Sequence, residues 1–169
     1  MLKVVRILGL DPGLRHTGWG LISVEGQLFR YIDSGVINPS MKEESLALRL
    51  AELFEKLSAV ITQTEPDEAV VEETFVNKNP ASTLKLGMAR GIVLLAPARA
   101  GVPVFEYTAN QLKKSVVGSG HADKMQVSHM VRRLLPLSPI NLKADASDAL
   151  AVALCHAHHR LLNQLISFS

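Results

Sequence analysis

The sequence predicts an α/β domain built on a mixed five-stranded sheet that is flanked by helices. Three β-type segments follow one another directly near the amino terminus, and short turns join them, which predicts an antiparallel meander. From residue 43 onward, helical and strand segments alternate, and strand–helix–strand units favour parallel pairing. The composition, with 47% hydrophobic and 20% charged residues, is that of an ordinary globular chain.

The meander accounts for the first three expected strands. Residues 4–11 form a short apolar run rich in β-branched side chains, which is typical of a central strand. Residues 18–26 and 28–37 have the pattern of two further strands, with glycine-containing turns before and between them. Consecutive strands joined by turns this short are expected to run antiparallel.

The hydrophobic period then changes to three and four residues, which predicts an amphipathic helix over residues 43–63. Pro66 stops this helix, and residues 68–75 have the pattern of a fourth strand. The remaining expected elements are, in order, a helix over 80–101, a strand over 102–107, helices over 109–118 and 123–135, and a long final helix over 144–166.

Length and composition limit the class of protein. The 169 residues suit one domain, 1–169, and the single cysteine, Cys155, has no partner for an intrachain disulfide. No signal peptide is expected, and no apolar run reaches the roughly 18 residues of a membrane span. We therefore expect a cytoplasmic protein without a membrane partner. Its net charge of +2 permits a nucleic-acid partner without requiring one.

Carboxylates interrupt the pattern at three places. Asp11 ends the first strand, Glu72 and Glu73 follow the apolar Val70–Val71, and Asp145 and Asp148 open the last helix. Each place has a local explanation. Asp-Pro-Gly is a common turn, one member of a glutamate pair usually faces solvent, and Asp145 with Asp148 resembles a capping box.

A joint interpretation is stronger. If the first and fourth strands lie side by side, Asp11 and Glu72 become neighbours, and the start of the last helix can bring Asp145 and Asp148 to them. Four converging carboxylates repel one another unless cations neutralise them. Hard divalent ions such as Mg²⁺ prefer oxygen ligands, and two such ions can support phosphodiester hydrolysis.

Four long segments resemble the RuvC family of bacterial Holliday junction resolvases: GLDPGLRHTGWG, VVEETFVNKNPASTLKLGMARG, VFEYTANQLKKSVVGSGHADKMQVSHMV and ADASDALAVAL. The resemblance implies a ribonuclease H-like fold, a homodimer and metal-dependent cutting of four-way junction DNA in recombination and repair. It implies two Mg²⁺ ions per site, with Mn²⁺ as a substitute, and work alongside the RuvA–RuvB branch-migration complex.

The family's site residues fall on particular positions of this chain. The catalytic and metal-binding carboxylates implied are Asp11, Glu72, Asp145 and Asp148, and some relatives carry histidine at the Asp145 position. The DNA-binding residues implied or expected are Phe75, Lys78, Lys113, Lys114 and Lys124. Each lysine could instead be a solvated surface residue, and Phe75 could pack beneath its own loop.

Three further features leave alternatives open. Gly87 and Gly91 lie four residues apart on an expected helix, where the resemblance implies a dimer contact and packing on the sheet is equally good. The segment CHAHHR, residues 155–160, could suggest a metal site, but a structural role is favoured. His121 lies beside a glycine loop and has a weaker claim to function.

Two other classes of protein compete with a nuclease. A phosphate-transferring ATPase of the actin and sugar-kinase type shares a similar first strand and turn, but such proteins generally need two domains. A non-catalytic or differently specific DNA-binding protein of the same fold would be expected to lack some of the carboxylates, and all four are present.

Overall fold

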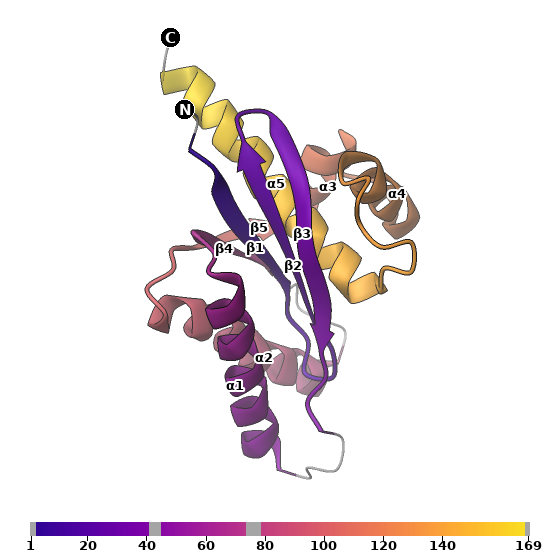
Figure 1. Ribbon diagram of the computed structural model, residues 1–169. Helices are drawn as coiled ribbons and strands as arrows, with labels where there is room; N and C mark the ends of the chain where they lie inside the picture. Colours follow the sequence, from indigo (N-terminus) through magenta and orange to yellow (C-terminus); the bar gives the residue numbers. More distant parts are fainter. Residues whose placement is uncertain (1–2, 41–44, 74–78, 168–169) are drawn as a thin grey trace.

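The computed structural model describes residues 3–40, 45–73 and 79–167, and places them in one five-stranded sheet with helices on both faces (Figure 1). The elements follow the predicted order: β1 Val5–Asp11, β2 Thr17–Glu25, β3 Leu28–Ile37, α1 Leu46–Thr64, β4 Glu68–Glu73, α2 Pro80–Arg99, β5 Val104–Thr108, α3 Ala109–Val117, α4 Lys124–Leu134 and α5 Ala144–Ser167.

The strand order across the sheet is β3-β2-β1-β4-β5. β1 pairs antiparallel with β2, and β2 pairs antiparallel with β3, as the meander predicts. β4 runs parallel to β1 on one side and to β5 on the other. The predicted adjacency of the first and fourth strands is therefore confirmed, and it puts the ends of β1 and β4 at the centre of one sheet edge.

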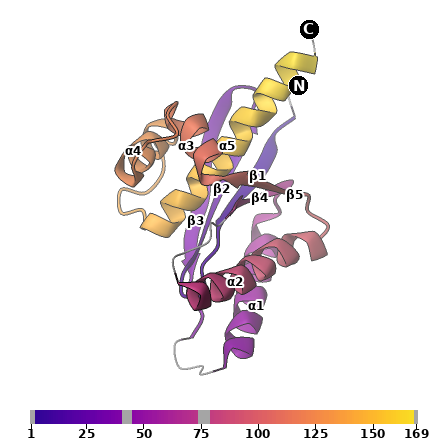
Figure 2. The same ribbon diagram turned by 180° about the vertical axis from the view of Figure 1, so that it is seen from behind.

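Two hydrophobic cores lie on opposite faces of the sheet (Figures 1 and 2). Alternate residues of β1 divide between them: Ile7 packs with α3, α4 and α5, whereas Leu8 packs with α1 and α2. In β4, Val70 belongs to the α5 face and Val71 to the opposite face. By the same alternation, Glu72 lies on the α5 face and Glu73 on the other.

Glycines let α5 lie directly on the sheet. A Cβ atom on Gly9 would lie 2.0 Å from the carbonyl oxygen of Ala149, and one on Gly18 would lie 1.9 Å from the carbonyl oxygen of Asp145. Both contacts are far shorter than real Cβ contacts, so only glycine fits at these positions while α5 keeps this distance. The close approach fixes the start of α5 over the ends of β1 and β2.

One helix start and one capping interpretation differ from the predictions. α1 begins at Leu46, three residues later than expected, because the Ser45 side chain accepts a hydrogen bond from the Leu48 amide and caps the helix. α5 begins at Ala144, so Asp145 lies inside the first turn rather than at the cap. The capping-box interpretation of Asp145 and Asp148 is therefore wrong.

Other boundaries agree with the sequence patterns. Pro80 opens α2 behind the capping residue Asn79, and Gly101 follows the helix with a positive φ of 75°. β4 is described as far as Glu73; Phe75 and Lys78 lie outside the described residues. None of the described helices has the length and apolarity that a membrane crossing would need.

Candidate active site

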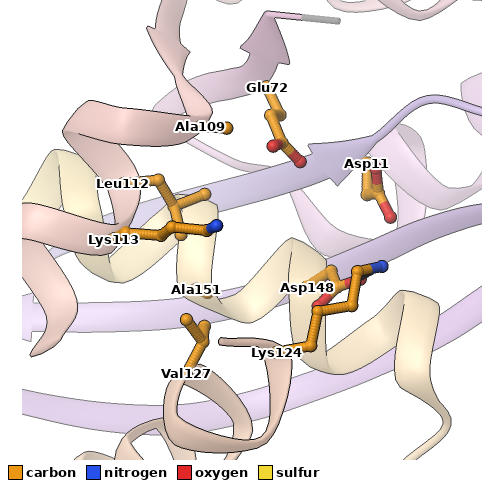
Figure 3. Close-up of a pocket in the computed structure, with 9 residues that line it drawn as sticks. All are labelled: Asp11, Glu72, Ala109, Leu112, Lys113, Lys124, Val127, Asp148 and Ala151. Carbon is orange, nitrogen blue, oxygen red and sulfur yellow. Dashed lines mark hydrogen bonds and ion pairs between the residues drawn. The ribbon is translucent and has the colours of Figure 1, made fainter. Parts of the chain in front are cut away.

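The carboxyl ends of β1 and β4 bring two acidic side chains together. Leu10 pairs with Val71 in the parallel register, so Asp11 and Glu72 follow at adjacent positions and on the same face of the sheet. Both line a hollow of about 120 Å³ (Figure 3). The hollow, which we call the carboxylate pocket, is lined by Asp11, Glu72, Ala109, Leu112, Lys113, Lys124, Val127, Asp148 and Ala151.

The first turns of α5 supply the other two acids, and they reach different sides of Asp11. Asp148 lines the carboxylate pocket, whereas Asp145 lines a separate and larger groove that also includes Asp11. Gly18 pairs with Asp11 across the β1–β2 ladder, and the Asp145 backbone lies directly over it. Asp11 is thus the residue that the two spaces share.

The tight turn after Asp11 is held by Thr17, which is fully buried. The Thr17 hydroxyl donates to the Gly13 carbonyl at 2.6 Å, and the Gly13 amide donates to Thr17 Oγ1 at 3.3 Å. Pro12 is also buried. Asp11 therefore belongs to a turn and to a cluster of acids at once, so its local and functional interpretations are compatible.

Burial and repulsion between carboxylates raise the pKa values of Asp11 and Glu72. The pKa of Asp11 is raised from 3.8 to about 7, chiefly by burial and also by the charges of Glu72, Asp148 and Asp145. Burial also raises the pKa of Glu72, and Asp148 raises it further, while Lys124 and Lys113 partly offset the rise. Such a cluster is stabilised by any cation that enters it.

Two lysines of the pocket come from capped helices. Asp123 and Gln126 form a capping box that begins α4, and Lys124 lies in its first turn. Lys124 Nζ lies 3.3 Å from Asp148 Oδ2, and the charge of Asp148 raises the pKa of Lys124. Thr108 and Gln111 cap α3 in the same way and position Lys113. Lys114, one residue on, is exposed and does not line the pocket.

The donor set suits a hard divalent cation, since it consists of carboxylate oxygens whose negative charge is only partly balanced by lysine. Within residues 3–40, 45–73 and 79–167, no three acidic, histidine or cysteine side chains are arranged to hold one ion as they stand. Lys124 is bonded to Asp148 in this arrangement. An ion that binds here would compete with that lysine for the Asp148 carboxylate.

The histidine-rich segment of α5 belongs to the protein interior. His156 Nδ1 hydrogen-bonds the Tyr107 hydroxyl at 2.9 Å, and His156 Nε2 hydrogen-bonds Glu68 at 2.7 Å. Arg160 pairs with the same glutamate. His156 is buried, and burial lowers its pKa. These contacts give the segment the favoured structural role. His121 is exposed and lines neither space beside Asp11.

Sequence reasoning missed two sets of residues around the site. The first is the glycines beneath α5, which a repeated Gly-x-Gly at residues 18–20 could have signalled, because alternate glycines flatten one face of a strand. The second is a group of cations beside Asp145, formed by Arg15, Arg49 and Lys85. These three lie far apart in the sequence, and no local pattern joins them.

Known proteins are similar to this chain over nearly its whole length. The family model described as crossover junction endodeoxyribonuclease RuvC matches residues 7–156. A relative of that name from Paramagnetospirillum magneticum is 57% identical over 163 residues, covering 96% of this chain and 97% of its own. Another, from Methylobacterium radiotolerans, is 57% identical over 160 residues, covering 95% of this chain and 76% of its own.

A solved structure of the same family has a similar fold. The structure described as T. thermophilus RuvC in complex with Holliday junction substrate superimposes with a TM-score of 0.86 at 34% identity. The match covers 94% of this chain and 96% of that one. The mixed sheet and its flanking helices are thus the ribonuclease H-like fold that the sequence motifs implied.

Proposed function

The chain belongs to the RuvC family of crossover junction endodeoxyribonucleases, and from this premise we propose how its residues cut DNA. The activity is structure-specific hydrolysis of phosphodiester bonds in Holliday junctions, within DNA recombination and repair. The convergence of Asp11, Glu72 and Asp148 in one pocket, with Asp145 against the other side of Asp11, carries the assignment of the site. The matches in name and structure favour this reading over a non-catalytic DNA-binding protein.

The four carboxylates would hold the divalent metal, which we propose to be two Mg²⁺ ions, with Mn²⁺ as a substitute. When bound, such ions supply an activated water and stabilise the charge on the leaving oxygen. β1, β4 and α5 hold the backbones of these residues around one point, so ion binding would need only side-chain movements, including the release of Asp148 from Lys124. Among the described residues that line the carboxylate pocket there is no serine, threonine or cysteine, which supports water as the nucleophile. The products would be a 5′ phosphate and a 3′ hydroxyl.

Lysines beside the acids would hold the DNA backbone. Lys113 and Lys124 both point into the carboxylate pocket (Figure 3), where their ammonium groups can contact phosphates without reading bases. Lys114 lies next to Lys113 on α3 and is exposed, so its positive charge can attract DNA from farther away. The family resemblance supports roles for Lys78 in phosphate binding and Phe75 in stacking on an unpaired base.

The exposed face of α2 supports a homodimer. Leu84, Met88 and Leu95 expose 63%, 38% and 47% of their surface, and they lie on one helical stripe with Gly87 and Gly91. A Cβ atom on either glycine would meet no described atom within 4 Å outside the neighbouring residues and backbone of α2. Packing against the described part of the chain therefore does not require glycine there, whereas a second helix approaching closely would.

The two-fold axis of such a dimer would present two active sites to one junction and produce paired, symmetric nicks. We further propose that the chain forms a single nuclease domain over residues 1–169. It would act in the cytoplasm, where bacterial DNA lies, together with the RuvA–RuvB branch-migration complex.

The test compares wild type with Asp11→Asn on a synthetic four-way junction in Mg²⁺, with a linear duplex of the same sequence as the substrate control. We expect paired nicks in the junction from wild type, and binding without cutting from the variant. Cutting by Asp11→Asn at the wild-type rate would refute the site. Equal binding of duplex and junction would refute the preference for junctions.

A further inference from the structure

We propose that the groove on the Asp145 side of Asp11 is a second backbone-binding channel, in which Arg15, Arg49 and Lys85 hold phosphates of the strand being cut. This inference rests on the proposed nuclease function and extends it to residues outside the lysines described above. The channel would carry the strand away from Asp11 in the direction opposite to Lys113 and Lys124.

The groove has the size and lining that a DNA strand requires. Its volume is about 500 Å³, roughly four times that of the carboxylate pocket at about 120 Å³. The side chains that give it its chemistry are Asp11, Asp145, Arg15, Arg49, Ser82 and Lys85. Among the described residues that line it, the acids are the two assigned to the metal, and the other charged or titratable side chains are Arg15, Arg49, Lys85 and His16. We call this space the Arg15 groove.

The three cations have no acidic partners among the described residues. The ion pairs among the described residues are formed by other basic residues, namely Arg30, Lys56, Arg90, Lys124, His156 and Arg160. Arg15 and Lys85 are exposed, and no described hydrogen bond holds either side chain. Positive charge that is not neutralised within the chain, and that gathers in one groove, is suited to a polyanion.

Arg49 shows the same incomplete pairing in a more fixed position. Its only described hydrogen bond is from Nη2 to the Leu14 carbonyl, at 3.4 Å, and its Nε atom is buried without a partner. A guanidinium presents five donors in a rigid fork that matches phosphate. Arg49 therefore reaches from α1 to the loop after Asp11 with one described hydrogen bond, and its guanidinium lines the groove.

Helix α2 separates this function from the proposed dimer contact. Lys85 and Leu86 lie three and four residues after Ser82, so the three side chains share one side of α2, and this side lines the Arg15 groove. Leu84, Met88 and Leu95 lie on a different stripe and do not line it. The same helix can thus face a second subunit and a DNA strand at once.

Of the described residues that line the two spaces, Asp11 is the one they share. A strand whose scissile phosphate lies at Asp11 would have its neighbouring phosphates on one side near Lys113 and Lys124, and on the other side near Arg15, Arg49 and Lys85. The groove thus explains how an acidic centre holds a polyanion from both directions.

The test uses full-length protein carrying Arg15→Gln with Lys85→Gln. Both residues are exposed and have no partner among the described residues, so the fold should be unaffected. The matched control is Lys3→Gln with Arg30→Gln, which removes the same two charges from exposed positions at the opposite end of the sheet. Junction affinity is measured without divalent metal over a range of salt concentrations.

Each lost phosphate contact lowers the slope of log affinity against log salt by about 0.9. The groove variant should therefore lose about 2 from the slope and roughly 10- to 100-fold in affinity near 0.1 M salt. The control should lose less than about 0.5 in slope. Arg49→Gln alone should lower the slope by about 1.

Junctions carrying one neutral methylphosphonate then locate the contact. For wild type, neutral phosphates on both sides of the cutting point should weaken binding. The groove variant should lose this sensitivity on one side only, and Lys113→Gln should lose it on the other side.

Equal loss of slope in groove and control variants would show a general effect of net charge and overturn the inference. Loss of sensitivity on the same side for both variants would also overturn it. A groove variant with the wild-type slope, when wild type still cuts junctions, would refute the groove alone. Failure of wild type to cut would refute the proposed function instead.

Discussion

Gly18→Ala should disable the active site without changing any of its functional side chains. The new Cβ would lie 1.9 Å from the carbonyl oxygen of Asp145, and this separation must grow by about 1 Å before it reaches the 3.0 Å limit for real Cβ contacts. The start of α5 must therefore shift, and Asp145 and Asp148 shift with it. A misplacement of about 1 Å can cost roughly 100-fold in rate.

The assay is single-turnover cutting of a four-way junction by folded, saturating enzyme, so the rate reports chemistry rather than binding. We expect the rate to fall about 100-fold. Overpacking should also cost roughly 1–3 kcal/mol in the free energy of unfolding. Val24→Ala is the control, because it creates a cavity at the far end of the same strand and costs about 2 kcal/mol away from Asp145.

The control should cut at close to the wild-type rate. A Gly18→Ala enzyme that cuts within about threefold of wild type would refute the idea that the contact of α5 with the sheet sets the active-site geometry. An equal loss in Val24→Ala would assign the effect to lower stability instead.

Three other substitutions probe charge and assembly. Asp11→Asn should stabilise the metal-free protein at pH 8. The pKa of Asp11 is about 7 in the folded protein against an ordinary 3.8, so the folded protein loses stability as the pH rises from about 4 to 7, and the variant has no such carboxyl group to ionise. The gain is at most about 4 kcal/mol, at 1.36 kcal/mol per pKa unit, and should vanish near pH 4 in urea unfolding with a chelator; equal stabilities at pH 8 would contradict it. Lys113→Gln should slow cutting at subsaturating enzyme about tenfold, whereas Lys114→Gln, outside the carboxylate pocket, should change it less than threefold; the reverse order would contradict the pocket assignment. Leu84→Glu with Leu95→Glu should give monomers in sedimentation and convert paired nicks to single nicks, and a dimer of unchanged affinity would exclude this face of α2.

The sequence predicted the element order and the sheet pairing because those depend on local patterns. The apolar, β-branched run of residues 4–11 and the three- and four-residue spacing after residue 43 can each be seen within a short stretch of sequence. The adjacency of β1 and β4 also followed, since a meander leaves one edge of β1 for the parallel strands. The boundary at Ser45 was missed because the acidic residues before it are also acceptable in a helix.

The site was predicted only in part, because its geometry depends on packing between distant segments. Alternation alone could not choose between Glu72 and Glu73; the two cores decide, by placing Val70 beneath α5. Asp145 and Asp148 were expected at one spot. In the structure α5 places Asp148 in the carboxylate pocket and Asp145 in the Arg15 groove, with Asp11 between the two spaces. The Arg15 groove joins the loop after β1 with α1 and α2, and no single segment shows it.

The most direct test of the converging carboxylates is a comparison of Glu72→Gln with Glu73→Gln. These neighbours carry the same chemistry, but only Glu72 lines the carboxylate pocket, whereas Glu73 is exposed. Single-turnover cutting of a four-way junction in Mg²⁺ should be abolished by Glu72→Gln, with junction binding retained, and should stay within about twofold of wild type for Glu73→Gln. Loss of cutting in Glu73→Gln, or wild-type cutting by Glu72→Gln, would contradict the assignment of the metal site.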